Sequence, residues 1–331
     1  MSLQQTELVK NVQNTLVRSG YITSKGFKSR SSCFDLTARR ERLLFIKCLL
    51  NVDNFKQSQK NELKLISNMF IGSPILIGER NKHKEMEDGV VYNKNGIPTL
   101  SFSTFQDLVL NDIIPYIYAR RGGFFVKINE SKFESERSEL ELSLSELAEK
   151  VGVSRKTIYS YEHGKMDTSL EIYKKLKKFF SSKINKPIEI FSWELQIDED
   201  YINELKDKLD DLRNDINELF LNLGLTAIWP KKALFDAITT EDEESKQDVA
   251  TASREIKIIT GLGSKDEKTK VIYQKIQQIQ SISQVIPSPN MFITEEKRSL
   301  PGDVKVPIIE KKKLEKLEKK ELFKKISNFL N

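Results

Sequence analysis

One segment in the middle of the chain, residues 134 to 165, restricts the possible fold more than any other. Ser143 or Ser145 can cap a first helix, because a serine oxygen accepts a hydrogen bond from a free N–H of the first helical turn. Gly152 can end that helix in the left-handed conformation, and Ser154 can cap a second helix directly afterwards. The apolar positions that form the inward faces and the turn are Leu147, Ala148, Val151, Val153, Ile158 and Tyr161. The pattern predicts two short helices that cross at a tight turn.

The outward side of the second helix begins with cationic and polar residues. The residues that remain outside are Arg155, Lys156, Thr157, Tyr159 and Ser160. A helix N-terminus that carries two cations suits phosphate groups and the edges of guanine bases alike. The segment therefore indicates a DNA-binding helix-turn-helix. The alternative is a protein-binding or purely structural bundle, since the same apolar pattern occurs in ordinary cores, although a merely solvated face would show mixed charges.

These residues resemble the Cro/C1-type helix-turn-helix of phage repressors. The family's signature stands in this chain as Leu142-Ser143, Glu146-Leu147-Ala148, Gly152-Val153-Ser154, Ile158, Tyr161-Glu162 and Gly164-Lys165. Leu144 is a departure, because the family usually has a glutamine there that helps to clamp a phosphate. The resemblance therefore implies a normal fold with one phosphate contact weakened.

The resemblance also implies roles for individual residues. It implies that residues 155 to 160 face the major groove, while Ser143 and Lys165 approach phosphates. In the family an arginine of the first helix commonly pairs with the glutamate that follows the recognition helix. Arg137 and Glu162 occupy those positions, so the resemblance implies a structural pair between them.

Before this segment, short apolar runs alternate with helical spacing. Helices are expected over residues 3–19 and 61–69 and from 105 to 110, and strands over 21–27, 32–38, 43–50, 73–78, 89–92 and 97–102. This alternation predicts an α/β module.

The C-terminal part repeats these features in the same order. A long helix over 205–222 ends at Leu223-Gly224, as the first helix ends at Gly20. The further matches are residues 234–237 with 33–36, 256–262 with 43–50, 289–294 with 73–78, and 306–309 before a Lys/Glu helix with 97–100. The ordered set predicts a degenerate internal duplication. Residues 240–253 are expected to form a solvated insertion loop in the second copy.

The first module also carries an aspartate and, on the next strand, a lysine. Asp35 and Lys47 resemble part of the restriction-endonuclease-like or Holliday-junction-resolvase-like site, which uses an aspartate and then Glu-x-Lys to hold magnesium and activate water. Phe45 occupies the position of the acid. In the second module Asp236 remains, but residues 258–261 offer no lysine. Both sites lack necessary groups, so we expect no catalytic residue and no metal site.

The whole order of modules resembles a family of archaeal helix-turn-helix transcriptional regulators. The resemblance implies an α/β plus all-α fold, in which a central Cro/C1-type helical domain is flanked by two similar small α/β domains. The expected domains are an inactive restriction-endonuclease-like domain over residues 1–126, the helix-turn-helix domain over 127–190, helical throughout, and a degenerate repeat of the first domain over 191–331.

Composition adds little to this interpretation. The net charge of +6, from 54 basic and 48 acidic residues, permits a nucleic-acid partner without indicating one. Cys33 and Cys48 lie in apolar surroundings and are expected to be buried thiols, and His83 and His163 are too far apart in sequence to suggest a metal cluster. No window approaches the roughly 18 apolar residues of a membrane span, and the start lacks a signal-peptide block. We therefore expect a cytoplasmic, nucleoid-associated protein without cofactor or membrane partner.

The expected function is that of a sequence-specific regulator that binds double-stranded DNA and is not an enzyme. A homodimer is expected, because a single helix in one groove contacts too few base pairs for high specificity. One alternative is a structure-specific nuclease or resolvase that uses Asp35 and Lys47, against which Phe45 argues. Another is a nucleoid-associated protein of low sequence specificity. The operator, the sign of regulation and any small-molecule effector do not follow from the sequence.

Overall fold

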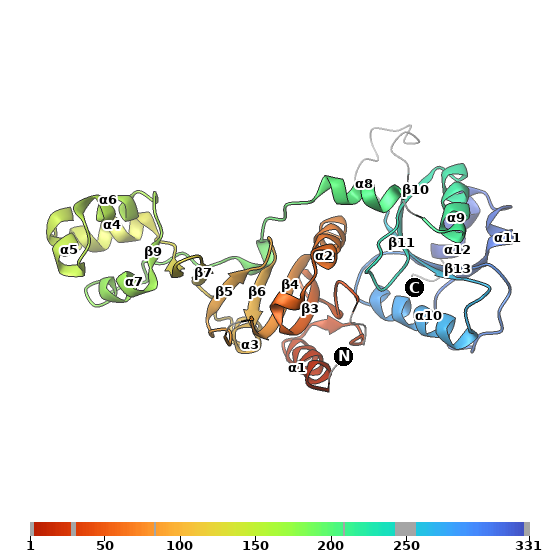
Figure 1. The fold of residues 1–331 in the computed structure, drawn as a ribbon, viewed down its shortest axis with the longest axis horizontal. Coiled ribbons are helices and arrows are strands. Elements are labelled where there is room, and N and C mark those ends of the chain that lie inside the picture. The colour runs from red at the N-terminus through yellow and green to blue at the C-terminus, as the bar shows by residue number, and fades with distance from the viewer. Residues whose placement is uncertain (1–2, 28–30, 83, 208, 242–255, 328–331) are drawn as a thin grey trace. The chain divides into compact units, whose positions relative to one another are not determined.

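The computed structural model describes residues 3–27, 31–82, 84–207, 209–241 and 256–327 (Figure 1). The chain forms two compact units. Unit 1 consists of Met1–Cys48, Phe55–Pro74 and Leu195–Asn331, and unit 2 consists of Leu49–Asn54 and Ile75–Glu194. Unit 1 therefore combines residues from both ends of the chain, while unit 2 contains the middle.

The N-terminal part of unit 1 is a helix packed on antiparallel strands. Its elements are α1 (Leu3–Arg18), β1 (Ile22–Thr23), β2 (Leu36–Arg39), β3 (Leu43–Asn51, which continues into unit 2) and α2 (Gln57–Met69). Helix α1 buries Val12 and Leu16, which are four residues apart and so lie on one helical face. The chain then turns at Gly20, whose φ is +79°, and enters β1. Strands β1, β2 and β3 are neighbours in that order.

Two strands of this part are shorter than predicted. The strand expected over 21–27 is only Ile22–Thr23, and the one expected from residue 32 begins at Leu36. The backbone between them bonds elsewhere: the N–H of Phe27 donates to the carbonyl of Asp35, and the N–H of Cys33 donates to the carbonyl of Lys232. These non-local hydrogen bonds satisfy the backbone without extending the strands.

The C-terminal part of unit 1 is a second α/β module. Its elements are α8 (Glu199–Asp207), α9 (Asp211–Asn222), β10 (Leu225–Ile228), β11 (Ala237–Glu241), β12 (Ile258–Gly263), α10 (Thr269–Ser283), β13 (Asn290–Thr294), β14 (Ile308–Glu310), α11 (Lys311–Leu314) and α12 (Lys319–Ser327). The strands follow the order β10-β11-β12-β13-β14, with the first two pairings antiparallel and the last two parallel. Phe220 from α9 and Met291 from β13 are fully buried in its core.

The prediction of a single helix over 205–222 is wrong. Asp210 interrupts it, because its side chain accepts the N–H of Arg213 and caps a separate helix, α9. The expected Lys/Glu helix is likewise divided, into α11 and α12. The predicted insertion loop over 240–253 lies outside the described residues, except for Thr240 and Glu241 in β11.

The predicted repetition of elements is present. The series α9, β10, β11, β12, α10, β13, β14, α11 has the same order as α1, β1, β2, β3, α2, β4, β6, α3, except that the first module has the additional strand β5 between β4 and β6. In each series the first three strands pair antiparallel, and the last two pair parallel. The predicted fold class, with two similar small α/β modules around a helical domain, is confirmed.

Unit 2 contains the rest of the first module and the central domain. Its elements are η1 (Val52–Asn54), β4 (Ser73–Arg80, of which the first two residues belong to unit 1), β5 (Val90–Asn93), β6 (Pro98–Ser101), α3 (Phe102–Leu110), β7 (Ile117–Arg120), β8 (Gly123–Val126), α4 (Glu130–Glu139), α5 (Leu144–Val151), α6 (Arg155–Glu162), β9 (Thr168–Ser169), α7 (Leu170–Leu176) and η2 (Ile190–Ser192). The strand order is β4-β6-β5-β7-β8-β9.

The prediction that the central domain is helical throughout is wrong. Strand β9 lies within it and pairs with β8. The residues that follow α7 also bond to the segment directly after β8. Ile128 and Asn185 form an isolated bridge, and the N–H of Lys186 donates to the carbonyl of Lys127. The hairpin of β7 and β8 was not predicted at all. It connects the sheet of unit 2 directly to the helices.

Candidate nucleic-acid interface

Helix α5 is the first helix of the predicted motif and begins at a capping box. The Oγ of Ser143 accepts the N–H of Glu146 at 3.2 Å, while the Glu146 carboxylate accepts the N–H of Ser143 at 2.8 Å. Ser143 is therefore the cap, and Ser145 is not. The hydrogen bonds from Ser143 lower the pKa of Glu146. Gly152, with φ of +77°, ends the helix in the left-handed conformation that glycine adopts without steric cost.

Helix α6 follows after a turn of three residues, Gly152, Val153 and Ser154. Its cap is Ser154, whose Oγ accepts the N–H of Thr157 at 3.1 Å. The N–H of Val153 donates to the carbonyl of Ala148 at 2.9 Å, which holds the turn against α5. The side chains that bury the two helices in one core include Phe133, Leu147, Ala148, Val151, Ile158 and Tyr161. The inward faces of α5 and α6 thus fix which side of α6 is left outside.

The outward side of α6 carries the five predicted residues. Arg155, Lys156 and Tyr159 are exposed, and Thr157 and Ser160 are partly exposed. Among the described residues, neither Arg155 nor Lys156 forms an ion pair. The two hydroxyls are held locally: that of Thr157 lies 2.9 Å from Ser154 Oγ, and that of Ser160 donates to the Lys156 carbonyl at 2.9 Å. The helix N-terminus therefore presents two free cations beside two oriented hydroxyls.

An aromatic and cationic cluster follows at the C-terminal end of α6. The rings of Tyr159 and His163 stack with centroids 3.9 Å apart, and Nζ of Lys165 lies 5.0 Å from the Tyr159 ring centroid. His163 Nδ1 is 2.9 Å from the Tyr159 carbonyl oxygen. Sequence reasoning missed His163 as part of this surface, although its position four residues after Tyr159 places both on one helical face. The stacking restricts the Tyr159 ring before any ligand binds.

Arg137 and Glu162 lie beneath this surface and contact each other. Nη2 of Arg137 is 2.6 Å and Nε 3.1 Å from the same Glu162 oxygen, and Nη1 donates to the carbonyl of Leu142 at 2.8 Å. The Glu162 side chain is 6% exposed and that of Arg137 is 19% exposed. The guanidinium therefore ties the end of α6 to the loop before α5.

The nuclease-like aspartate of the first module is closed to solvent. Oδ1 of Asp35 is 2.9 Å from Nζ of Lys47, Oδ2 accepts the N–H of Cys48 at 2.8 Å, and both charged side chains are 0% exposed. Burial raises the pKa of Asp35, and the nearby Lys47 opposes that rise. Phe45, at the position of the missing acid, is also fully buried. The lysine therefore neutralises the aspartate inside the core.

The matching aspartate of the second module, Asp236, also accepts a hydrogen bond from a backbone N–H of the neighbouring strand. Oδ2 of Asp236 accepts the N–H of Leu262 at 2.8 Å, and Oδ1 is 2.8 Å from Nη2 of Arg213. The side chain lies at the wall of a polar cavity of about 530 Å³, which Lys265 and Glu267 also line. Over the described parts of the chain, no three His, Cys, Asp or Glu side chains are placed to hold a metal ion.

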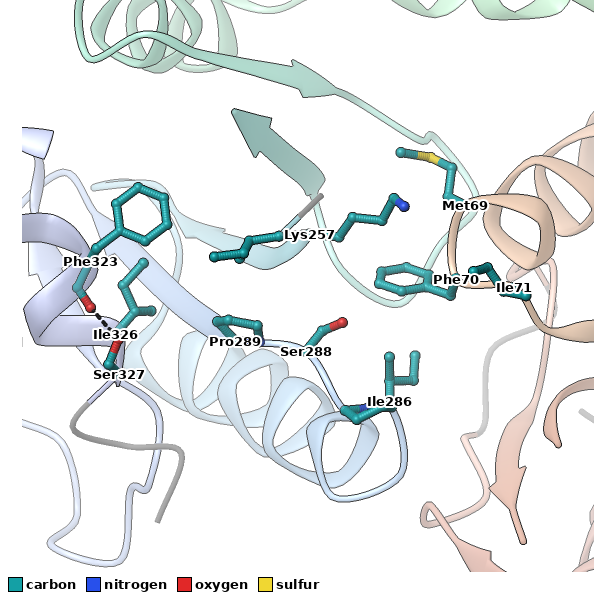
Figure 2. A pocket seen from close by; sticks show the side chains of 12 residues that line it. Met69, Phe70, Ile71, Lys257, Ile286, Ser288, Pro289, Phe323, Ile326 and Ser327 are labelled. Atoms are coloured by element: carbon teal, nitrogen blue, oxygen red, sulfur yellow. Dashed lines mark hydrogen bonds between the residues drawn. The ribbon is translucent and has the colours of Figure 1, made fainter. Parts of the chain in front are cut away.

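An apolar cavity of about 630 Å³ lies elsewhere in unit 1 (Figure 2). Met69, Phe70 and Ile71 at the end of α2 line one side, and Phe323 and Ile326 of α12 line another. The polar side chains of its described lining are those of Lys257, Ser288 and Ser327. The described lining contains no carboxylate.

Two other predictions concern the thiols and the membrane. Cys33 and Cys48 are buried and free, which confirms them as buried thiols, and burial raises the pKa of both. His83 lies outside the described residues. Of the helices that the structure describes, none combines the length and the apolar character that a bilayer crossing demands.

Comparison with known proteins agrees with the first α/β module and with the central helix-turn-helix domain. Residues 5–115 match a PD-(D/E)XK superfamily domain, and residues 134–185 match a helix-turn-helix family. A provisionally named HTH-type transcriptional regulatory protein of Pyrococcus horikoshii is 34% identical over 96% of this chain and 95% of its own length. Similarly named proteins of Thermococcus kodakarensis (32% identical, 96% and 93% covered) and Methanocaldococcus jannaschii (35% identical, 80% of each) also match. No solved structure matches the chain significantly.

Proposed function

Because the chain belongs to this family of archaeal HTH-type transcriptional regulatory proteins, we propose that it recognises specific sites in double-stranded DNA through the N-terminal and outward part of α6. The observation that carries the proposal is the exposed pair Arg155 and Lys156, free of described carboxylates, at a helix N-terminus. Two cations at this place that form no ion pair with the described residues suit guanine edges and phosphates. In this role the protein acts on chromosomal DNA in the cytoplasm.

The residues that we propose to contact DNA divide into two groups by position. Arg155, Lys156, Thr157, Tyr159 and Ser160 form the side that enters the major groove and contacts base edges. Ser143 and Lys165 lie at the beginning of α5 and after the end of α6, where phosphates of the two strands pass a helix-turn-helix. The Ser143 oxygen already accepts a hydrogen bond, so its contribution to a phosphate is its hydroxyl proton.

Arg137 and Glu162 have a positioning role in this proposal. Their ion pair holds the end of α6 against the loop before α5, and Glu162 is nearly buried. Loss of Arg137 would leave an unpaired carboxylate beneath the recognition surface, which is costly in a low-dielectric site. The pair therefore fixes the orientation of α6 without contacting DNA.

Specific recognition further requires two copies of α6. Each good bidentate base contact discriminates by about 1 to 3 kcal/mol, and one helix makes only a few such contacts. We therefore assign a homodimer, held mainly by the flanking modules over 1–126 and 191–331, with the recognition domain over 127–190. Two-fold symmetry places the helices on half-sites about one DNA turn, or a multiple of it, apart.

The same proposal makes the flanking modules structural and not catalytic. Asp35 is inaccessible and neutralised by Lys47, and Asp236 is held by Arg213. Phe45 replaces the acid that would complete a metal site in the first module. Magnesium- or manganese-dependent cleavage of duplex or branched DNA that Asp35→Ala abolishes would contradict this assignment.

The proposal is tested on a duplex selected from random sequences by binding to the purified protein. Arg155→Ala/Lys156→Ala should abolish preference for that duplex over unrelated DNA, with the fold and the light-scattering mass unchanged. Lys165→Ala should weaken binding to all sequences alike and reduce the salt dependence of binding by about one phosphate contact. Lys324→Ala/Lys325→Ala, which removes two exposed cations from α12, is the matched control. Unchanged preference in the Arg155/Lys156 variant would exclude α6 as the recognition element, and a monomeric mass would exclude the dimer.

A further inference from the structure

The hairpin of β7 and β8 lies beside the helix-turn-helix and is attached to it. Strand β8 pairs with β9, with Phe125 opposite Ser169 and Val126 opposite Thr168. Strand β9 begins three residues after Lys165, in the loop that leaves α6. The hairpin is thus one strand away from the segment that we assign to phosphate contact.

A side-chain hydrogen bond strengthens this attachment. The hydroxyl of Tyr118 on β7 donates to the carboxylate of Asp167. Burial, together with this hydrogen bond, raises the pKa of Tyr118 to about 12, so its hydroxyl remains a donor at neutral pH. On the other face of the hairpin, Phe124 packs edge-on against Tyr92 of β5, with ring centroids 6.4 Å apart. The hairpin is therefore fixed on both faces.

The tip of the hairpin is open to solvent. Arg120 pairs with Gly123, so Arg121 and Gly122 make the turn. Gly122 and Gly123 have φ values of +100° and +132°, which favour glycine, and a Cβ added to either would meet no atom within 4 Å. The turn therefore projects into free space.

The tip also carries two arginines, Arg120 and Arg121. Arg120 and Arg121 are exposed, and neither forms an ion pair with any described carboxylate. The Arg120 guanidinium lies 3.6 Å from the centroid of the Phe125 ring. Because Tyr118, Arg120 and Phe125 share one face of the hairpin, Arg120 is on the side that contacts Asp167 and the loop after α6. Stacking on Phe125 pre-orients the guanidinium and leaves its N–H groups free.

We propose that this hairpin is a wing that binds the phosphate backbone of the same duplex, next to the groove that α6 enters. The inference rests on the proposed function and extends its contact surface by Arg120 and Arg121. A planar guanidinium donates two parallel hydrogen bonds to one phosphate, and prior ordering reduces the entropy lost on binding. The wing contributes affinity and fixes orientation, but it does not read base sequence.

The test compares Arg120→Ala/Arg121→Ala with wild type and with Lys324→Ala/Lys325→Ala on the selected duplex and on an unrelated duplex. The wing variant should bind both duplexes roughly tenfold more weakly at about 0.1 M salt, with a salt dependence shallower by about one to two phosphate contacts. Its preference between the duplexes should not change. Arg120→Lys/Arg121→Lys should retain most of the affinity, and the α12 control should bind as wild type does.

Hydroxyl-radical footprinting provides the second readout. The wing variant should lose protection at phosphates flanking the site and keep it at the base pairs that α6 contacts. If wild type binds duplex DNA and the wing variant has the same affinity, salt dependence and footprint, the wing is excluded while the proposed function stands; a partner for the tip would then be an acidic protein surface. Failure of wild type to bind any duplex would overturn both.

Discussion

Asp35 in the first module and Asp236 in the second occupy the same place in two copies of one topology. The N–H of Asp35 donates to the carbonyl of Ile46, and that of Asp236 donates to the carbonyl of Thr260. Each carboxylate then accepts a backbone N–H two residues further along that strand, from Cys48 or from Leu262. The aspartate thus closes the beginning of its strand onto the next one in both modules.

The two aspartates differ in the source of their cation. Lys47 lies between Ile46 and Cys48 on the strand itself, and the position that matches it in the second module is Gly261. There the cation comes from helix α9, through Arg213, and the aspartate faces a polar cavity. The backbone hydrogen bonds of the aspartate are thus present in both modules, although only the first module has a lysine on the neighbouring strand. The comparison teaches that the aspartate bonds to the next strand in the same way whether its cation comes from that strand or from a helix.

The largest effect should come from removing the buried cation. Lys47→Met should lower the free energy of unfolding of unit 1 by about 3 to 5 kcal/mol, because Asp35 would be left charged and unpaired in the core. Urea denaturation monitored by far-UV circular dichroism measures this change in the free energy of unfolding. Asp35→Asn/Lys47→Met, which removes both charges, should recover part of the loss. A Lys47→Met protein as stable as wild type would show that Asp35 does not need its partner.

Local signals explain why the central motif could be predicted from the sequence. The caps Ser143 and Ser154 and the turn at Gly152 act within a few residues, and the inward faces follow from helical spacing. The neighbouring hairpin has a local signal as well, Gly122-Gly123 between two short apolar runs, although no hairpin was predicted there. Its pairing with β9 could not be predicted, because β9 lies more than 40 residues later and is only two residues long.

The same distinction separates the two aspartate sites. Asp35 and Lys47 could be placed on adjacent strands of the first module, although their ion pair was not predicted. Arg213 could not be paired with Asp236, because it lies 23 residues earlier, on a helix that the sequence pattern merged with another. Pairings between elements depend on packing, which periodicity does not encode.

An intermediate effect should come from filling the position that matches Lys47. A Cβ at Gly261 would meet Ile279 Cδ1 and lie 2.7 Å from Cδ2 of Phe292, so β12 has no room for a side chain there. Gly261→Ala should therefore cost about 1 to 3 kcal/mol through overpacking. Thermal unfolding of this variant and of Gly302→Ala, where a Cβ would meet no atom within 4 Å, provides the measurement and its control. Equal melting temperatures would mean that steric exclusion does not explain the missing lysine.

The smallest loss of stability should come from removing Arg213, the cation of the second module. The salt dependence of that loss should distinguish it from the loss caused by removing Lys47. Arg213 is about one third exposed and also pairs with Asp210, so its interaction with Asp236 is partly screened by water. Arg213→Ala should cost only about 1 kcal/mol at low ionic strength, and about half of that or less in 1 M NaCl, where the Debye length is about 3 Å. The loss in Lys47→Met should stay nearly constant over the same range, because salt does not reach a pair whose side chains are 0% exposed. Urea midpoints of both variants at two salt concentrations measure the contrast. If the two losses depended equally on salt, the fully buried and the partly buried aspartate would be held by the same kind of interaction, and the distinction drawn between the two modules would fail.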